Sequence, residues 1–113
     1  MEITGSDSVV DVMVGRLAAL ANGHRLTVFK ELVKAGHTGL SAGDIARRLN
    51  MPPSSLSFHL SHLRNEGLVH DQRIGRSIIY RANFGSMESL VRYLFEECCA
   101  DGSAPLECIA DKE

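Results

Sequence analysis

The chain has 113 residues, with 44% hydrophobic and 23% charged residues and a formal net charge of −2, which favours one globular domain over a disordered or fibrous chain. A single core of this size is small enough that a partner subunit would help to stabilise it. No apolar run approaches the length of a membrane span, and the acidic start MEITGSDSVV is unlike a signal peptide, so we expect a cytoplasmic protein without a membrane partner.

Three helices are predicted in the first half of the chain. The first spans 8–22, because a serine can cap it and apolar residues then recur at helical spacing. The second spans 24–35 and carries enough apolar residues to imply deep burial. The third spans 41–49, because the stretch SAGD has the spacing of a capping box.

A fourth helix is predicted within MPPSSLSFHLSHLRNEGLV. Pro53 suits a first helical turn, and Gly67 suits the left-handed position after a helix end. Between them, Leu56, Leu60 and Leu63 form one apolar stripe. A tight turn therefore separates the third helix from the fourth.

A β-hairpin and a last helix complete the predicted order. LVHDQRI and RSIIYRA indicate two short strands joined around Gly75, with Arg73 and Arg76 near the tip. A final helix opens at Ser86. Its apolar face comprises Met87, Leu90, Val91, Leu94, Phe95 and Cys98.

This order, α-α-α-α-β-β-α, predicts a mainly α fold with a small β-hairpin, a winged helix-turn-helix. We expect one domain over 1–113, with 100–113 as a C-terminal tail. Charge is unevenly distributed: four arginines against two acids give residues 54–82 a net charge of +2, whereas residues 83–113 carry −5. The middle of the chain is therefore the candidate for contact with a polyanion such as DNA.

The fourth helix supplies most of the predicted DNA-binding residues. With Leu60 pointing inward and about 100° between successive residues, its outward face and flanks are polar apart from one phenylalanine. We expect DNA contacts from Ser54, Ser55, Ser57, Phe58, His59 and His62, and from Arg73 and Arg76 on the hairpin. Ser61 shares the outward face. Serine hydroxyls can bond phosphates or base edges.

The two aromatic residue types on this helix leave alternatives open. An outward Phe58 can rest on thymine methyl groups in a major groove, or it can tuck against a neighbouring element. His59 and His62 are suited to phosphate, and equally to plain solvent exposure.

At these residues the chain resembles a known family. LSFHLSHLRNEGLV followed by RIGRSIIYR is similar to the recognition helix and wing of the ArsR/SmtB family of metal- and stress-responsive repressors, over about Val12 to Phe95. The resemblance implies a homodimer joined through its first and last helices, which binds an inverted-repeat operator in double-stranded DNA and leaves when an inducer arrives. The apolar faces of those two helices are reasonable dimer surfaces in their own right.

All three cysteines, Cys98, Cys99 and Cys108, lie in the last sixteen residues. In a reducing cytosol such a cluster indicates a metal site or reactive thiols rather than structural disulfides. Three sulfur ligands without a nearby histidine suit As(III) or Sb(III), which form three bonds, better than structural zinc, which takes four ligands. The flanking acidic residues disfavour thiolate and so argue against a peroxide sensor.

The cysteine pattern also resembles a smaller set of arsenic-responsive repressors, with a Cys pair at the end of the last helix and a third Cys shortly after. The Cys-x-Cys pair of other arsenic sensors is absent from SAGDIARRL, and the last helix has no histidine ligand of the zinc-sensing kind. We therefore expect a repressor that is released from DNA when As(III) or Sb(III) binds these thiols. The three sulfur ligands can come from one subunit or be shared across the dimer.

Alternative signals remain for the same repressor: an organoarsenical, Cd(II), Bi(III), a persulfide or thiol oxidation. A DNA-binding protein without any inducer is a further alternative. An enzyme is not expected, because the sequence contains no CxxC pair, no phosphate-binding glycine loop and no base placed near the thiols.

Overall fold

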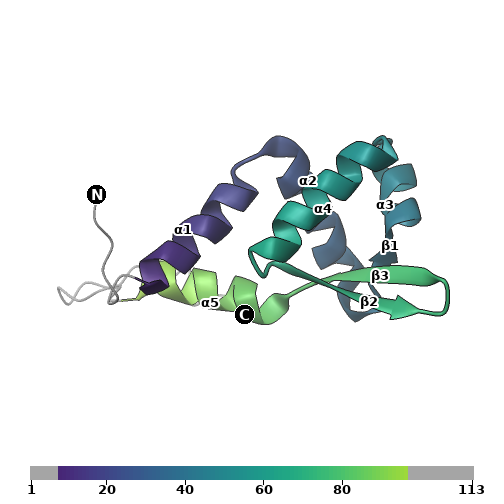
Figure 1. The fold of residues 1–113 in the computed structure, drawn as a ribbon. Helices are drawn as coiled ribbons and strands as arrows, with labels where there is room; N and C mark the ends of the chain where they lie inside the picture. Colours follow the sequence, from purple (N-terminus) through teal and green to yellow (C-terminus); the bar gives the residue numbers. More distant parts are fainter. Residues whose placement is uncertain (1–7, 97–113) are drawn as a thin grey trace.

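The structure, a computed structural model, describes residues 8–96 (Figure 1). Its helices are α1 (Ser8–Leu20), α2 (Gly23–Ala35), α3 (Ala42–Leu49), α4 (Pro53–Asn65) and α5 (Phe84–Phe95), with a 3-10 turn η2 (Gly36–Thr38). Its strands are β1 (Leu40–Ser41), β2 (Val69–Ile74) and β3 (Ser77–Ala82). This arrangement confirms the predicted mainly helical winged helix-turn-helix.

Short polar contacts fix the helix boundaries. The Asn22 side chain accepts a hydrogen bond from the Arg25 amide at 3.0 Å and begins α2. Ser41 accepts one from the Asp44 amide at 3.1 Å and begins α3, as the capping-box spacing predicts. Asn50 ends α3 in the left-handed conformation, with φ of 52°. The turn between α3 and α4 is thereby set by local sequence.

The wing is a three-stranded antiparallel sheet in the order β1-β3-β2. Ile74 pairs with Ser77, so the hairpin loop consists of Gly75 and Arg76 alone. Gly75 has a φ of 63°, which a two-residue hairpin with glycine in its first position requires. The short strand β1 was not predicted; it pairs Leu40 with Tyr80 and ties the start of α3 to the wing.

The core lies among α2, α3, α4 and the base of the wing. The apolar stripe of α4 is the predicted one, since Leu56, Leu60 and Leu63 are all buried. They pack with Leu32, Ile45 and Leu68, which are fully enclosed. Burial of this stripe holds the opposite face of α4 toward solvent.

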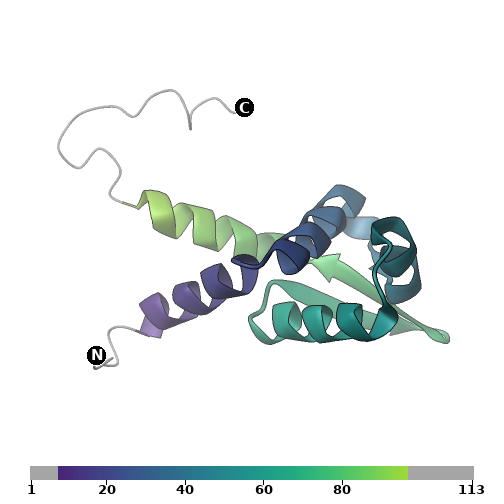
Figure 2. The same ribbon diagram turned by 90° about the horizontal axis from the view of Figure 1, so that it is seen from above.

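The first and last helices extend away from the wing (Figure 2) and keep much of their apolar surface exposed. The exposed apolar residues include Val9, Val12, Val14 and Leu17 on α1, and Val91, Leu94 and Phe95 on α5. Leu26 on α2 is also 43% exposed, so that helix is less deeply buried than its composition predicts. Among residues 8–96 of the single chain, no helix packs over these surfaces.

The start of α5 differs from the predicted one. The helix begins at Phe84 rather than at Ser86, because the Asn83 side chain caps it and accepts from the Ser86 amide at 3.1 Å. Ser86 is a buried first-turn residue instead. The helix ends at Phe95, and Cys98, predicted on the same face, lies outside the described residues.

Candidate nucleic-acid interface

The exposed face of α4 carries most of the predicted DNA-binding side chains. Ser54, Ser55, Ser57 and Phe58 are exposed, on the side opposite the buried leucines. Phe58 is 65% exposed, so the alternative in which it tucks against a neighbouring element is wrong. An apolar ring surrounded by small hydroxyl groups suits a surface that meets both base methyls and phosphates.

The two histidines of α4 are less free than the serines. His62 and His59 are half-buried. The His59 ring stacks on His24 of α2, with centroids 5.5 Å apart and an interplanar angle of 26°, and meets the Phe58 ring edge-on at 5.7 Å. Burial, followed by the charges of His24, Arg25 and His62, lowers the pKa of His59 below its ordinary value.

The wing carries the two predicted arginines. Arg73 lies on β2 opposite Ile78, and Arg76 occupies the second position of the hairpin loop; both are exposed. The ion pairs of the described residues involve other arginines, among them Arg64 with Asp71 at 3.0 Å. Two guanidinium groups near the hairpin tip can therefore reach an anion without first breaking an internal pair.

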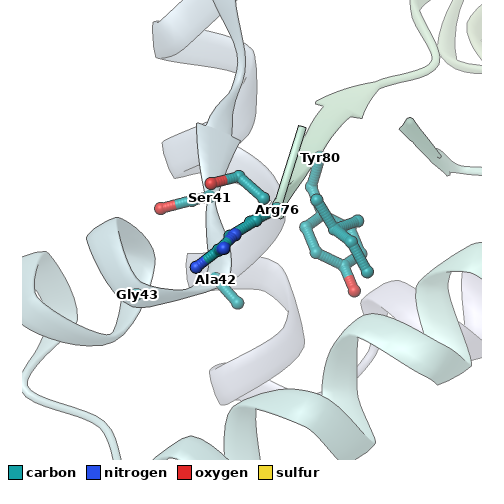
Figure 3. Close-up of a pocket in the computed structure, with 7 residues that line it drawn as sticks. Ser41, Ala42, Gly43, Arg76 and Tyr80 are labelled. Carbon is teal, nitrogen blue, oxygen red and sulfur yellow. The ribbon is translucent and has the colours of Figure 1, made fainter. Parts of the chain in front are cut away.

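An open groove lies between the wing and the start of α3 (Figure 3). It has a volume of about 390 Å³, and both polar and apolar residues line it: Ser41, Ala42, Gly43, Arg76, Ser77, Ile78 and Tyr80. In Figure 3 the Arg76 side chain extends toward Ala42. Hydroxyl groups and a guanidinium beside the first turn of a helix form a surface suited to phosphate.

Sequence reasoning missed the contribution of Ser41, Ser77 and Tyr80 to this groove, and that of His24 to the histidine pair. The groove exists because β1 pairs with β3, a contact between segments about 40 residues apart that no local pattern announces. For His24, position 24 lies in a helix start, and nothing in the sequence relates it to His59 on α4.

Among residues 8–96, no three His, Cys, Asp or Glu side chains come together in a way that could hold a metal ion. The predicted ligands Cys98, Cys99 and Cys108 lie outside this range. Across the same range, no helix has the length and apolar character needed to span a membrane.

The fold and this surface define a winged helix-turn-helix DNA-binding protein. A helix-turn-helix domain family matches residues 20–72. The chain is 30% identical to the transcriptional activator HlyU of Vibrio cholerae over 83 residues, covering 74% of each chain. An ArsR-like transcriptional regulator from a Rhodococcus species superposes with a TM-score of 0.72 at 28% identity, over 84% of this chain and 86% of that one.

A further solved structure, the homodimeric winged helix-turn-helix DNA-binding domain of Mb0332 from Mycobacterium bovis, gives a TM-score of 0.67 at 23% identity, over 94% of this chain and 97% of that one. The chain belongs to the ArsR/SmtB family of winged helix-turn-helix transcriptional regulators. It is a DNA-binding transcription regulator and not an enzyme, as predicted.

Proposed function

We propose that the protein is a homodimeric repressor that binds an inverted-repeat operator and is released when As(III) or Sb(III) binds Cys98, Cys99 and Cys108. The observation that carries the DNA-binding part is the exposed α4 face, with Phe58 among serines, next to the arginine-bearing wing. In this proposal the serines, Phe58 and His62 enter the major groove or meet its edges, while Arg73 and Arg76 bind the backbone or the adjacent minor groove.

The exposed apolar faces of α1 and α5 support the homodimer. Val12 and Leu17 on α1 are 46% and 41% exposed, and Leu94 on α5 is 56% exposed. A two-fold dimer buries the same surface on both subunits, which removes these side chains from water. Two-fold symmetry would give the dimer two equivalent α4 helices, so the operator should contain two half-sites in inverted orientation, about one helical turn apart.

Selection of bound sequences from random DNA duplexes tests the first part of the proposal. We expect an inverted repeat with half-sites spaced by about 10 base pairs, bound by a species of twice the monomer mass. A selected sequence without internal symmetry, or a monomer bound to a single half-site, would contradict the dimeric mode. Leu94→Glu, which places a charge on the apolar face of α5, should lower both dimer formation and operator affinity.

The chemistry of the three thiols supports the inducer. Arsenite is As(OH)₃ near neutral pH, and each thiol can form an As–S bond while an As–O bond breaks, the thiol proton leaving with hydroxide as water. Three thiols thus give As(SR)₃ and three waters, with no change of oxidation state. We propose that residues 100–113, which contain Cys108, act as the tail that brings the third sulfur to the other two.

A hydrogen-bonded joint provides a route from α5 to the DNA-binding elements. The Asn83 side chain caps α5 and donates to the Gly67 carbonyl at 3.0 Å, while the Asn83 amide donates to the Leu68 carbonyl at 2.8 Å. Gly67 and Leu68 connect α4 to β2. A displacement of α5 on metalloid binding would therefore pull directly on the junction between the recognition helix and the wing.

Arsenite titration of the protein–operator complex tests the inducer. We expect release of the wild-type protein and no release of the Cys98→Ser, Cys99→Ser, Cys108→Ser triple variant. The coupling needs only about 1–3 kcal/mol of differential affinity to change operator binding 5- to 150-fold. Unchanged operator affinity of the wild type at saturating arsenite, or full release of the triple variant, would defeat the proposal.

The three single cysteine variants distinguish inorganic As(III) from inducers that need two sulfurs. A three-sulfur ion should lose most of its effect with each single Cys→Ser change, whereas a two-sulfur inducer should tolerate one of them. X-ray absorption of the arsenite-loaded protein should count three As–S bonds per ion. A count of two would contradict the three-sulfur site and would favour an inducer that needs only two sulfurs.

A further inference from the structure

A small pocket lies between the start of α2 and the N-terminal half of α4. It encloses about 220 Å³ and is lined by His24, Met51, Pro52, Ser55 and His59. Ser55 belongs to the exposed face of α4, so the pocket borders the proposed DNA-binding surface. The pocket is large enough for one phosphate group and contains two imidazoles and a hydroxyl.

The His59 ring lines this pocket, and one of its nitrogens has an unmet hydrogen-bonding capacity. His59 Nδ1 is buried and has no hydrogen-bond partner among the described residues. Buried polar groups in proteins are nearly always paired, so an unpaired one calls for a partner that a bound molecule can supply. The stacked His24 ring, 5.5 Å away by centroids, is itself exposed and opens to the same region.

The charges around His59 are all of one sign. Those that act on it are His24 and Arg25 from α2 and His62 from its own helix, and no carboxylate is among them. In the free protein burial, followed by the charges of these groups, lowers the pKa of His59 and favours the neutral imidazole. An anion placed against the pair would reverse this balance, because it would favour the imidazolium and offset the repulsion from Arg25.

We propose that His24 and His59 together bind one backbone phosphate of the operator, and that this histidine pair takes up a proton when DNA binds. The inference rests on the DNA-binding part of the proposed function and is independent of the inducer. It adds α2 to the DNA-binding surface, and it makes operator affinity depend on pH near neutrality.

The sign of the pH dependence follows from linkage. If the pKa of the pair is higher in the complex than in the free protein, affinity is greatest at low pH and declines as pH rises through the pKa of the complex. The window extends from that pKa down to the pKa of His59 in the free protein, which burial lowers below its ordinary value. Each pocket that takes up one proton can change affinity by as much as about tenfold per pH unit within the window.

Operator affinity measured from about pH 5.5 to 8 at constant ionic strength tests the proposal. We expect wild-type affinity to rise as pH falls and the salt dependence to steepen by about 0.9 per pocket at the acidic end. His24→Gln and His59→Gln should flatten the pH dependence. The matched control is His37→Gln in η2, which follows the far end of α2, roughly 18 Å along the helix from its start. This variant should keep the wild-type pH dependence.

A second measurement keeps the test valid if His59→Gln folds poorly. Imidazole NMR titration of the wild-type protein, free and bound to a selected duplex, should show a higher pKa for His59 in the complex. Equal pKa values in the two states, or an unchanged pH slope in folded His24→Gln, would overturn the proposal. Absence of DNA binding at every pH would instead overturn the DNA-binding role on which it rests.

Discussion

Replacement of Arg76 by alanine probes the wing with little disturbance to the fold. Arg76 is exposed in the two-residue hairpin loop, and the ion pairs of the described residues do not include it. The free energy of unfolding of the variant should therefore lie within about 0.5 kcal/mol of the wild-type value. Any loss of operator affinity can then be assigned to the missing guanidinium groups.

The expected size of that loss follows from counterion release. One phosphate contact contributes about 0.9 to the slope of log affinity against log salt concentration, so two subunits contribute about 1.8. A fourfold change in salt, from about 50 to 200 mM, then changes the ratio of wild-type to variant affinity about 12-fold. Fluorescence anisotropy of a labelled operator at several salt concentrations measures both slopes.

Lys34→Ala is the matched control, because it removes one positive charge from an exposed side chain in the last turn of α2 rather than from the wing. It should leave the salt slope unchanged. A phosphate contact also predicts that Arg76→Ala weakens binding similarly across operator sequences. An unchanged slope for Arg76→Ala, or a loss confined to one base pair, would refute the assignment of this arginine to the DNA backbone.

Two further substitutions test the recognition helix and the wing. Phe58→Ala should keep the free energy of unfolding, measured by urea titration, within about 0.5 kcal/mol of the wild-type value, since the ring is 65% exposed. It should weaken operator binding by about 1–3 kcal/mol per subunit. A large loss of stability would contradict the exposed position of the ring. Gly39→Ala should destabilise the fold by at least about 1–2 kcal/mol, because Gly39 has a φ of 71° and an added Cβ would lie 2.6 Å from the Tyr80 carbonyl oxygen. The control variant Gly23→Ala, with open space around the added Cβ, should be neutral or slightly stabilising. Equal melting temperatures for the two variants would argue against the β1–β3 packing.

Local sequence signals predicted most of the helices. The capping-box spacing at Ser41, the proline in the first turn of α4 and the leucine stripe of α4 each act within a few residues, so they were sufficient to place α3 and α4. The start of α5 was misplaced because Asn83 and Ser86 are both good capping residues. The choice of Asn83 coincides with its second role, since the same side chain bonds Gly67 across the fold.

Contacts between distant segments were beyond such signals. Strand β1 has two residues and exists only through its pairing with β3. The stacking of His24 on His59 depends on how α2 crosses α4. The exposure of Leu26 depends on whether another element of the chain packs against that side of α2. Each of these is a property of packing rather than of spacing.

The amino-acid sequence alone determined the order of helices and hairpin, the outward serines of the fourth helix, and the gathering of all thiols at one end, because periodicity, capping and composition are local properties. The exposure of Phe58, which the sequence left open, was decided by the packing of the folded chain. Tertiary structure decided which histidine faces which, that the wing and α3 share one groove, and that apolar faces of α1 and α5 stay uncovered in one chain. Those outcomes depend on how the helices and the wing pack around a single small core, and this packing brings together segments that are distant in the sequence.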